Sequence, residues 1–182
     1  MTLYRCFDAA YPPAKTPAAM QAALGYIGRK GRTPHVWTLA EWQRFEGLRY
    51  FPCWVPDYRL DAAREADAAV EAALHLGWAA HQQPNRVIIA DHEMEGTSIR
   101  GWHEAFADRV AGHGFDAVAY GSASSVFNIG AEHVWVAAWD GKTNLPSGET
   151  VHAHQFAAFT KHDVSVVDEW LWARAGQGPR HS

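Results

Sequence analysis

Residues 86–95 read RVIIADHEME, a short apolar run followed directly by acids. The run Val87–Ala90 is typical of a strand buried on both faces. Side chains alternate along a strand, so Asp91 and Glu93 should point to one face, with Cβ atoms ~6.5–7 Å apart, and His92 to the other. Two acids that close in a partly dry site cannot both ionise easily, so the pKa of one should rise. The stretch therefore meets the physical requirement for a general acid beside an ionised partner.

Strand-like and helix-like segments alternate on either side of this stretch. The helices are predicted at 16–24, 38–45, 61–76 and 97–111, with one possible turn within 122–130. The strands are predicted at 3–8, 25–29, 49–55, 86–94, 116–121, 133–139, 151–156 and 164–168. Alternation of this kind favours a parallel sheet, and eight strands favour its closure. We predict one domain over residues 1–182, an α/β TIM-like barrel whose outer helix layer is incomplete in the last third.

The bulk composition limits the classes of partner that we expect for the chain. The chain has 182 residues, 48% of them hydrophobic and 20% charged, as expected for an ordinary globular protein. Its formal net charge of −4 argues against nucleic acid as a partner. No apolar run approaches the ~20 residues that span a bilayer, and the N-terminus lacks signal-peptide features. We expect synthesis in the cytoplasm, no membrane partner, and two buried, reduced thiols at Cys6 and Cys53.

Acids follow three of the predicted strands. Asp8 ends the first strand, Asp91 and Glu93 end the central one, and Asp168 ends the last. In a β/α barrel the carboxyl ends of all parallel strands lie on one face, where catalytic groups sit. The pattern therefore predicts that all four carboxylates meet at one mouth of the barrel.

In their order and spacing, the motifs resemble the family-25 glycoside hydrolases, which are lysozyme-like muramidases. The matching segments are Phe7-Asp8, Ile89–Glu93, Ala119–Ser122, Val134–Ala137, His154–Phe156 (where the family usually has Trp-Gln-Tyr) and Val167-Asp168. The resemblance implies a barrel of five β/α units followed by three strands. It also implies glycoside hydrolysis without a cofactor or metal, and a polysaccharide substrate, with peptidoglycan favoured.

The resemblance also assigns roles to the acids. Glu93 would protonate the leaving glycosidic oxygen, and Asp91 would stabilise the developing positive charge. Asp8 and Asp168 would support the site by hydrogen bonding and electrostatics. The chain differs from the family in following Asp8 with Ala-Ala-Tyr-Pro-Pro instead of the usual Asp-x-Ser. This form is similar to a glycoside-hydrolase-like domain found in actinobacterial and phage proteins.

Several further side chains are predicted to contact substrate. Aromatic rings at or near strand ends could stack on sugar rings: Tyr120, Trp54, Trp139 and Phe156. The resemblance adds His154 and Gln155 as wall or substrate contacts. His152 and His154 are two positions apart on one strand and could instead chelate a metal, the less favoured interpretation.

Three functions remain open from the sequence. The favoured one is a muramidase- or endolysin-like hydrolase of an amino-sugar glycan, acting at the cell wall after release or as part of a phage particle. The second is a catalytically weak barrel that binds glycan or serves as a structural part of a virion. The third is a metal-dependent hydrolase using His152, His154, Asp91 and Glu93.

Overall fold

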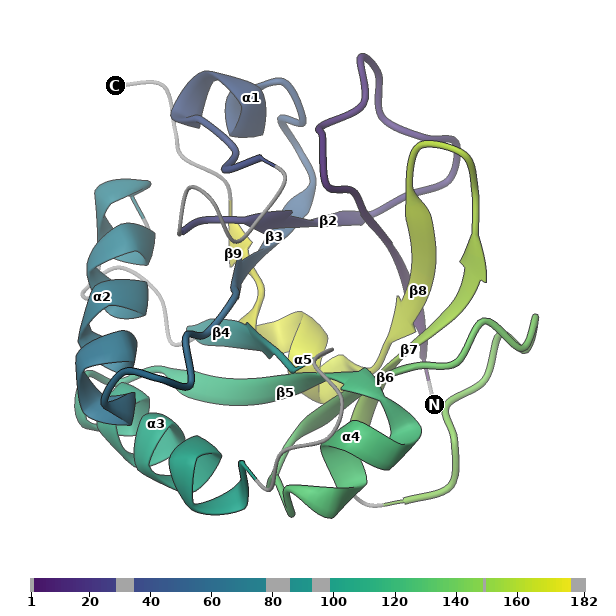
Figure 1. Ribbon diagram of the computed structural model, residues 1–182. Helices are drawn as coiled ribbons and strands as arrows, with labels where there is room; N and C mark the ends of the chain where they lie inside the picture. The colour runs from purple at the N-terminus through teal and green to yellow at the C-terminus, as the bar shows by residue number, and fades with distance from the viewer. Residues whose placement is uncertain (1, 29–34, 78–85, 93–98, 149, 178–182) are drawn as a thin grey trace.

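Eight strands form a closed barrel in the computed structural model, which describes residues 2–28, 35–77, 86–92, 99–148 and 150–177 (Figure 1). The strands are β1 (Tyr4–Asp8), β2 (Ala22–Tyr26), β3 (Arg49–Trp54), β4 (Val87–Asp91), β5 (Asp116–Ser122), β6 (Val134–Ala137), β7 (Val151–Ala158) and β8 (Asp163–Val167). A two-residue strand, β9 (Gly176–Gln177), pairs antiparallel with the start of β3. The prediction of an eight-stranded α/β barrel is confirmed.

The strand order shows one departure from a parallel barrel. The order is β2-β1-β8-β7-β6-β5-β4-β3, and β2–β3 pairing closes the ring. All neighbours in this ring are parallel except β8, which runs antiparallel to both β1 and β7. The short turn between β7 and β8 forces this direction, because a parallel connection needs a crossover of a dozen or more residues.

Helices cover only part of the barrel wall. They are α1 (Leu39–Gln43), α2 (Ala62–His75), α3 (Arg100–Gly112), α4 (Ala123–Asn128) and α5 (Glu169–Arg174). The helix predicted at 16–24 is wrong, since that segment has no helix and β2 begins within it, three residues before the predicted strand. Thr16-Pro17 is a helix start signal in the sequence, but pairing of Ala22–Leu24 with β1 places the following residues in a strand instead. The outer layer therefore lacks a helix between β1 and β2.

The interior and the outer wall have separate apolar cores. Alternation along β1 places Cys6 in the interior cluster and Phe7 in the outer one. The interior also holds Trp135 and Leu171. Both cysteines are buried and neither is in a disulfide, as predicted. Burial raises the pKa of the Cys6 thiol, and the nearby Asp8 charge adds to the effect. Phe7 and Asp8 therefore face opposite sides, which turns Asp8 toward the inside.

Helix α5 closes one end of the barrel. It is seen across the middle of the ring in Figure 1, and its Leu171 and the following Ala175 are buried with the interior residues. Asp168 begins this helix as its N-cap, accepting a hydrogen bond from the Leu171 N–H at 2.8 Å. The carboxyl ends of the parallel strands lie at the opposite end of the barrel, which is called the open end below. No helix of the described chain is long and apolar enough to cross a membrane.

Behind β4, a buried chain of polar rings joins the sheet to α3. The Tyr58 hydroxyl lies 2.6 Å from His92 Nδ1, and His92 Nε2 lies 2.8 Å from His103 Nδ1. Burial lowers the pKa of His103 to about 4 and that of His92 well below its usual value, an effect that the neighbouring His103 adds to. Both imidazoles are therefore neutral in the folded protein at neutral pH.

The lowered pKa values of these two histidines predict that the folded protein is less stable in acid. An unfolded histidine has a pKa of about 6.5, so between pH 6.5 and 4 the unfolded chain binds protons that folded His103 does not. The free energy of unfolding should fall as the pH drops through this window, by up to about 1.4 kcal/mol per pH unit for each histidine. Urea unfolding measured from pH 7 to 4 checks this, and His103→Gln should flatten part of the slope. A stability that is constant across the window would contradict the prediction.

Candidate active site

A buried glutamine gathers two of the acids at the open end of the barrel. The amide nitrogen of Gln155, on β7, donates to Asp8 Oδ2 at 2.5 Å and lies 3.4 Å from Asp163 Oδ2. Its carbonyl oxygen accepts a hydrogen bond from the Tyr120 hydroxyl at 3.0 Å. Gln155 has no exposed surface, so both ends of its amide are fixed by these partners. Strands β1, β5, β7 and β8 thus share one polar network.

Asp91 lies at the same end, on the far side of this network. It is the last residue of β4, is 8% exposed, and accepts a long hydrogen bond of 3.4 Å from the Tyr26 hydroxyl. Asp91 is in register with Tyr120 of β5, and both follow alternating strand positions that face the interior. The structure therefore brings Asp8 and Asp91 together at one mouth, as predicted.

Glu93 lies outside the described residues. The described backbone supports the expected alternation up to the residue before it, since the His92 N–H donates to the Tyr120 carbonyl at 2.7 Å and extends the β4–β5 ladder. The His92 ring contacts Tyr58 and His103 on the outer side, opposite to Asp91. The expectation for Glu93 stays a prediction.

The sequence interpretation missed Asp163. It opens β8 and is in register with Asp8 across the β1–β8 pair. Partial burial raises the pKa of Asp163, and the nearby His162 only partly offsets this. Two carboxyl groups opposite each other favour one protonated member. The signal for Asp163 was the short segment between two strands, which predicts a hairpin and so places the start of β8 at the mouth.

The prediction that Asp168 lies at the mouth is wrong. Because β8 is antiparallel, its last residues pair with the start of β1, Val167 opposite Tyr4, at the end closed by α5. There the Asp168 carboxylate accepts a hydrogen bond from His152 Nδ1 at 2.9 Å, and His152 Nε2 lies 3.1 Å from His133 Nδ1. Asp168 therefore holds a helix and a histidine pair, at the opposite end from Asp91.

This placement also rules out the metal site built from His152, His154, Asp91 and Glu93. His152 lies at the closed end with Asp168, whereas His154 Nδ1 donates to the Asn144 carbonyl outside the barrel, at 2.8 Å. Asp91 is at the mouth. Among the described residues no group of three His, Cys, Asp or Glu side chains is arranged to hold a metal ion. The histidine spacing reflects two separate structural contacts.

Replacement of Asp168 by Ala should therefore destabilise the protein without a direct effect on chemistry. The variant loses the cap of α5 and the acceptor for His152, which together are worth about 1–3 kcal/mol of unfolding free energy. Denaturant unfolding measures the loss. An unfolding free energy equal to that of the parent would contradict this structural role of Asp168.

Three predicted substrate contacts face the outer layer, so that prediction is wrong for them. Trp54 packs against α2, where its indole N–H donates to buried Glu65 at 3.2 Å. His154 and Phe156 lie outside the barrel, where Phe156 packs with Val164 and Val166 of β8. Gln155 and Tyr120 do line the mouth.

Trp139 keeps its place as a possible sugar contact. It follows β6 at the open end and is 49% exposed. Its φ of 45° is uncommon for a bulky residue. Its backbone N–H donates to the backbone carbonyl of Gln155 at 3.1 Å. The backbone of the buried glutamine therefore holds the backbone of an exposed tryptophan at the end of β6.

Comparison with known proteins identifies the same fold elsewhere. No family model matches the chain, and no curated protein matches its sequence. An uncharacterized B. stearothermophilus protein superposes with a TM-score of 0.75 at 14% identity, covering 95% of this chain and 100% of the other. A glycosyl hydrolase 25 of Streptococcus pneumoniae, described as a virulence factor participating in host cell invasion, has a TM-score of 0.60 at 10% identity, covering 92% and 88%. A family 25 glycosyl hydrolase from Bacillus anthracis has a TM-score of 0.60 at 11% identity, covering 93% and 92%. The chain thus has the fold of family 25 glycosyl hydrolases.

Proposed function

We propose that the protein is a glycoside hydrolase that cleaves an amino-sugar glycan, with bacterial peptidoglycan as the favoured substrate. The observation that carries the proposal is the Gln155 network, which holds Asp8 and Asp163 at the open end of the barrel on which Asp91 also ends. A fully buried amide bonded to carboxylates from two strands is a costly arrangement unless every partner is satisfied. Its place at the mouth supports a site over a scattered set of surface acids.

In the proposed reaction the acids divide the work that glycoside hydrolysis requires. Glu93 protonates the leaving glycosidic oxygen as the glycosidic bond breaks, and ionised Asp91 stabilises the positive charge that develops at the sugar. Water then forms the new bond to the anomeric carbon and returns a proton to the Glu93 carboxylate. Gln155 orients Asp8 and Asp163 through hydrogen bonds to their carboxylates. Tyr26, bonded to Asp91, and Tyr120, bonded to Gln155, hold the remaining partners in place. Neither a cofactor nor a metal has a part in this proposal.

The proposed setting is the bacterial cell wall. The partner is the wall polysaccharide, reached after release of the protein or from within a phage particle. Trp139, half exposed at the mouth, offers a sugar-stacking surface. Tyr120 and Gln155 are buried and bonded to each other, so they support the acids of the site from within the barrel.

Hydrolysis of purified peptidoglycan tests the proposal. Release of soluble reducing ends and clearing of a wall suspension, both lost in an Asp91→Asn variant, is the expected result. A protein that pellets with the wall without clearing it would overturn the hydrolase proposal in favour of a glycan-binding barrel. The altered sequence after Asp8, Ala9 to Pro13, is the observation that favours this second function.

A further inference from the structure

A groove of about 460 Å³ leads away from the acid network between two loops. One wall is the segment that follows β1, Ala9–Ala14, and the other is the turn that joins β7 to β8, Phe159–His162. Asp8 and Asp163 line the end of the groove where these two loops meet the barrel. Each wall carries one large ring in contact with solvent: Tyr11 is 61% exposed and Phe159 is 59% exposed.

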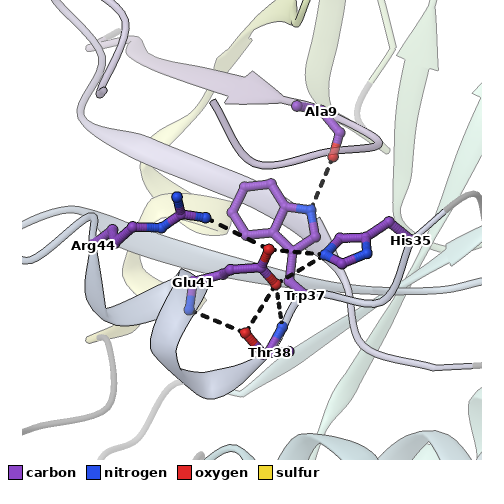
Figure 2. Close-up of polar contacts among 6 residues, drawn as sticks. All are labelled: Ala9, His35, Trp37, Thr38, Glu41 and Arg44. Atoms are coloured by element: carbon purple, nitrogen blue, oxygen red, sulfur yellow. Dashed lines mark hydrogen bonds and ion pairs between the residues drawn. The ribbon is translucent and has the colours of Figure 1, made fainter. Parts of the chain in front are cut away.

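The Tyr11 wall is braced from beneath. Tyr11 stacks on His35, with ring centroids 5.3 Å apart and planes 18° apart. His35 Nε2 lies 2.9 and 3.0 Å from the two carboxylate oxygens of Glu41, as Figure 2 shows. Partial burial would raise the pKa of Glu41, but hydrogen bonds from Thr38 and His35 outweigh it and lower the pKa. Glu41 is therefore ionised, and it holds the imidazole against which Tyr11 rests.

The same helix start anchors the backbone beside Asp8. Thr38 and Glu41 form the capping box of α1, and the neighbouring Trp37 indole N–H donates to the Ala9 carbonyl at 3.1 Å (Figure 2). Trp37 itself is 1% exposed and packs on Trp42. The loop that carries Tyr11 is thus tied to the core one residue after the acid, so its wall has a fixed position relative to Asp8.

The Phe159 wall has a matching support. Phe159 stacks on His162 with ring centroids 5.3 Å apart and planes 17° apart, and its N–H donates to the His162 carbonyl at 2.9 Å, closing the turn. His162 in turn contacts buried Phe7 edge-on at 6.3 Å. Each exposed ring is therefore backed by an imidazole, which is held by Glu41 in the case of His35 and contacts the core at Phe7 in the case of His162. Ordering a ring before the ligand arrives reduces the entropy lost on binding.

The turn that carries Phe159 also carries a cation. Lys161 lines the groove, is exposed, and has no ion pair within the part of the chain that the structure describes. The nearby Asp8 and Asp163 are engaged with Gln155. An ammonium group on this rim attracts an anionic substituent, whereas the carboxylates at the end of the groove repel one, so an acidic ligand has a preferred orientation.

We propose that this groove binds one pyranose ring of the glycan, packed against Tyr11 and Phe159, with a carboxylate substituent of that sugar on Lys161. The proposal rests on the proposed function for the identity of the ligand as a glycan. It adds a position for a neighbouring sugar, beyond the acids, and a preference for a carboxylate-bearing chain over a neutral one. Tyr11 and Phe159 bind the ring, and Lys161 sets the preference.

Binding measured without turnover tests the two rings. In a Glu93→Gln background, titration calorimetry with soluble peptide-free wall glycan strands gives the dissociation constant. Tyr11→Ala and Phe159→Ala should each weaken binding by about 2- to 12-fold, the range measured for single aromatic contacts. Tyr11→Phe and Phe159→Tyr, which keep the rings, should bind as the parent does. Phe127→Ala is the matched control, since Phe127 is 48% exposed on α4 and does not line the groove. Unchanged binding in both alanine variants would overturn the proposal.

A pair of probes tests Lys161. The parent should bind the carboxylate-bearing strands more tightly than the same strands after chemical reduction of their carboxylates to alcohols, and Lys161→Gln should remove this difference. An equal effect of Lys161→Gln on both probes would refute the assignment of its role.

Failure of the proposed function can be distinguished from failure of this inference. A protein that binds strands through Tyr11 and Phe159 but never hydrolyses them would support the groove and contradict the proposed hydrolase activity. A protein that hydrolyses the wall with a KM that Tyr11→Ala and Phe159→Ala leave unchanged would support the hydrolase activity and contradict the groove.

Discussion

Asp91→Asn is expected to lower the rate of glycan hydrolysis by about 10²- to 10³-fold, the usual effect of removing one preorganised electrostatic contact to a developing charge. The substitution keeps the shape of the side chain and an oxygen that can accept the Tyr26 hydroxyl, now 3.4 Å away. It removes the negative charge at the end of β4. The loss should therefore fall on kcat, with little change in the free energy of unfolding.

The control for this variant is an acid of similar type away from the mouth. Asp67, on α2, pairs with Arg109 at 2.6 Å on the outer surface, so Asp67→Asn should leave the rate unchanged. Rates of reducing-end release from purified peptidoglycan, measured on both variants at matched folded concentration, make the comparison. Equal rates for Asp91→Asn and the parent would remove the charge of Asp91 from the mechanism.

The barrel could be predicted from the sequence because local signals and long-range pairing agree over most of the chain. The run Val87–Ala90 is a strand buried on both faces, and the Asp61 cap and Gly77 end bracket α2 closely. The segment before β2 is the exception. There Thr16-Pro17 is a good helix start, but a helix would have displaced Ala22–Leu24 from its pairing with β1. Tertiary pairing overrides local propensity at that point.

The site was predictable only where strand direction was known. Assigning every strand end to one mouth works for Asp8 and Asp91, because β1 and β4 belong to the parallel part of the barrel. It fails for Asp168, since β8 returns antiparallel from β7 and presents its first residue, Asp163, at the mouth. The short segment between β7 and β8 indicates the direction of β8, whereas the presence of an acid at the end of a strand does not.

Strand alternation could also have excluded the three incorrect substrate contacts. Cys53 and Gln155 face the interior, so their neighbours face outward: Trp54, His154 and Phe156. The groove formed by residues 9–14 and 159–162 was beyond sequence reasoning altogether, since its two walls are about 150 positions apart and meet only through the β1–β8 pairing.

Glu93→Gln should give the largest loss, about 10²- to 10⁴-fold in hydrolysis rate, because it removes the only proton that the proposed mechanism transfers to the leaving group. Glu93 follows Asp91 by two positions, and the ladder bond from the His92 N–H to Tyr120 keeps strand alternation up to the residue before it. An apolar strand and a neighbouring carboxylate are the conditions that raise the pKa of a general acid. The melting temperature should barely change, since the neutral acid and the amide are close in shape and charge.

The pH dependence separates this role from a structural one. If Glu93 must be protonated and Asp91 ionised, the parent should show a bell-shaped rate profile, and Glu93→Gln should lose its alkaline limb along with most of its rate. Glu95→Gln is the matched control, two positions further along, and should be mild because Glu95 is expected to lie beyond the strand. The assays are peptidoglycan hydrolysis from pH 4 to 9 together with thermal unfolding of each variant. A parent-like rate and profile in Glu93→Gln would end the assignment of Glu93 as the acid, because a carboxamide cannot donate the proton that the leaving group needs, and another group at the mouth would then have to supply it. A parent that binds the glycan without hydrolysing it would instead favour the glycan-binding module, since the rings and carboxylates of the mouth can still hold a sugar.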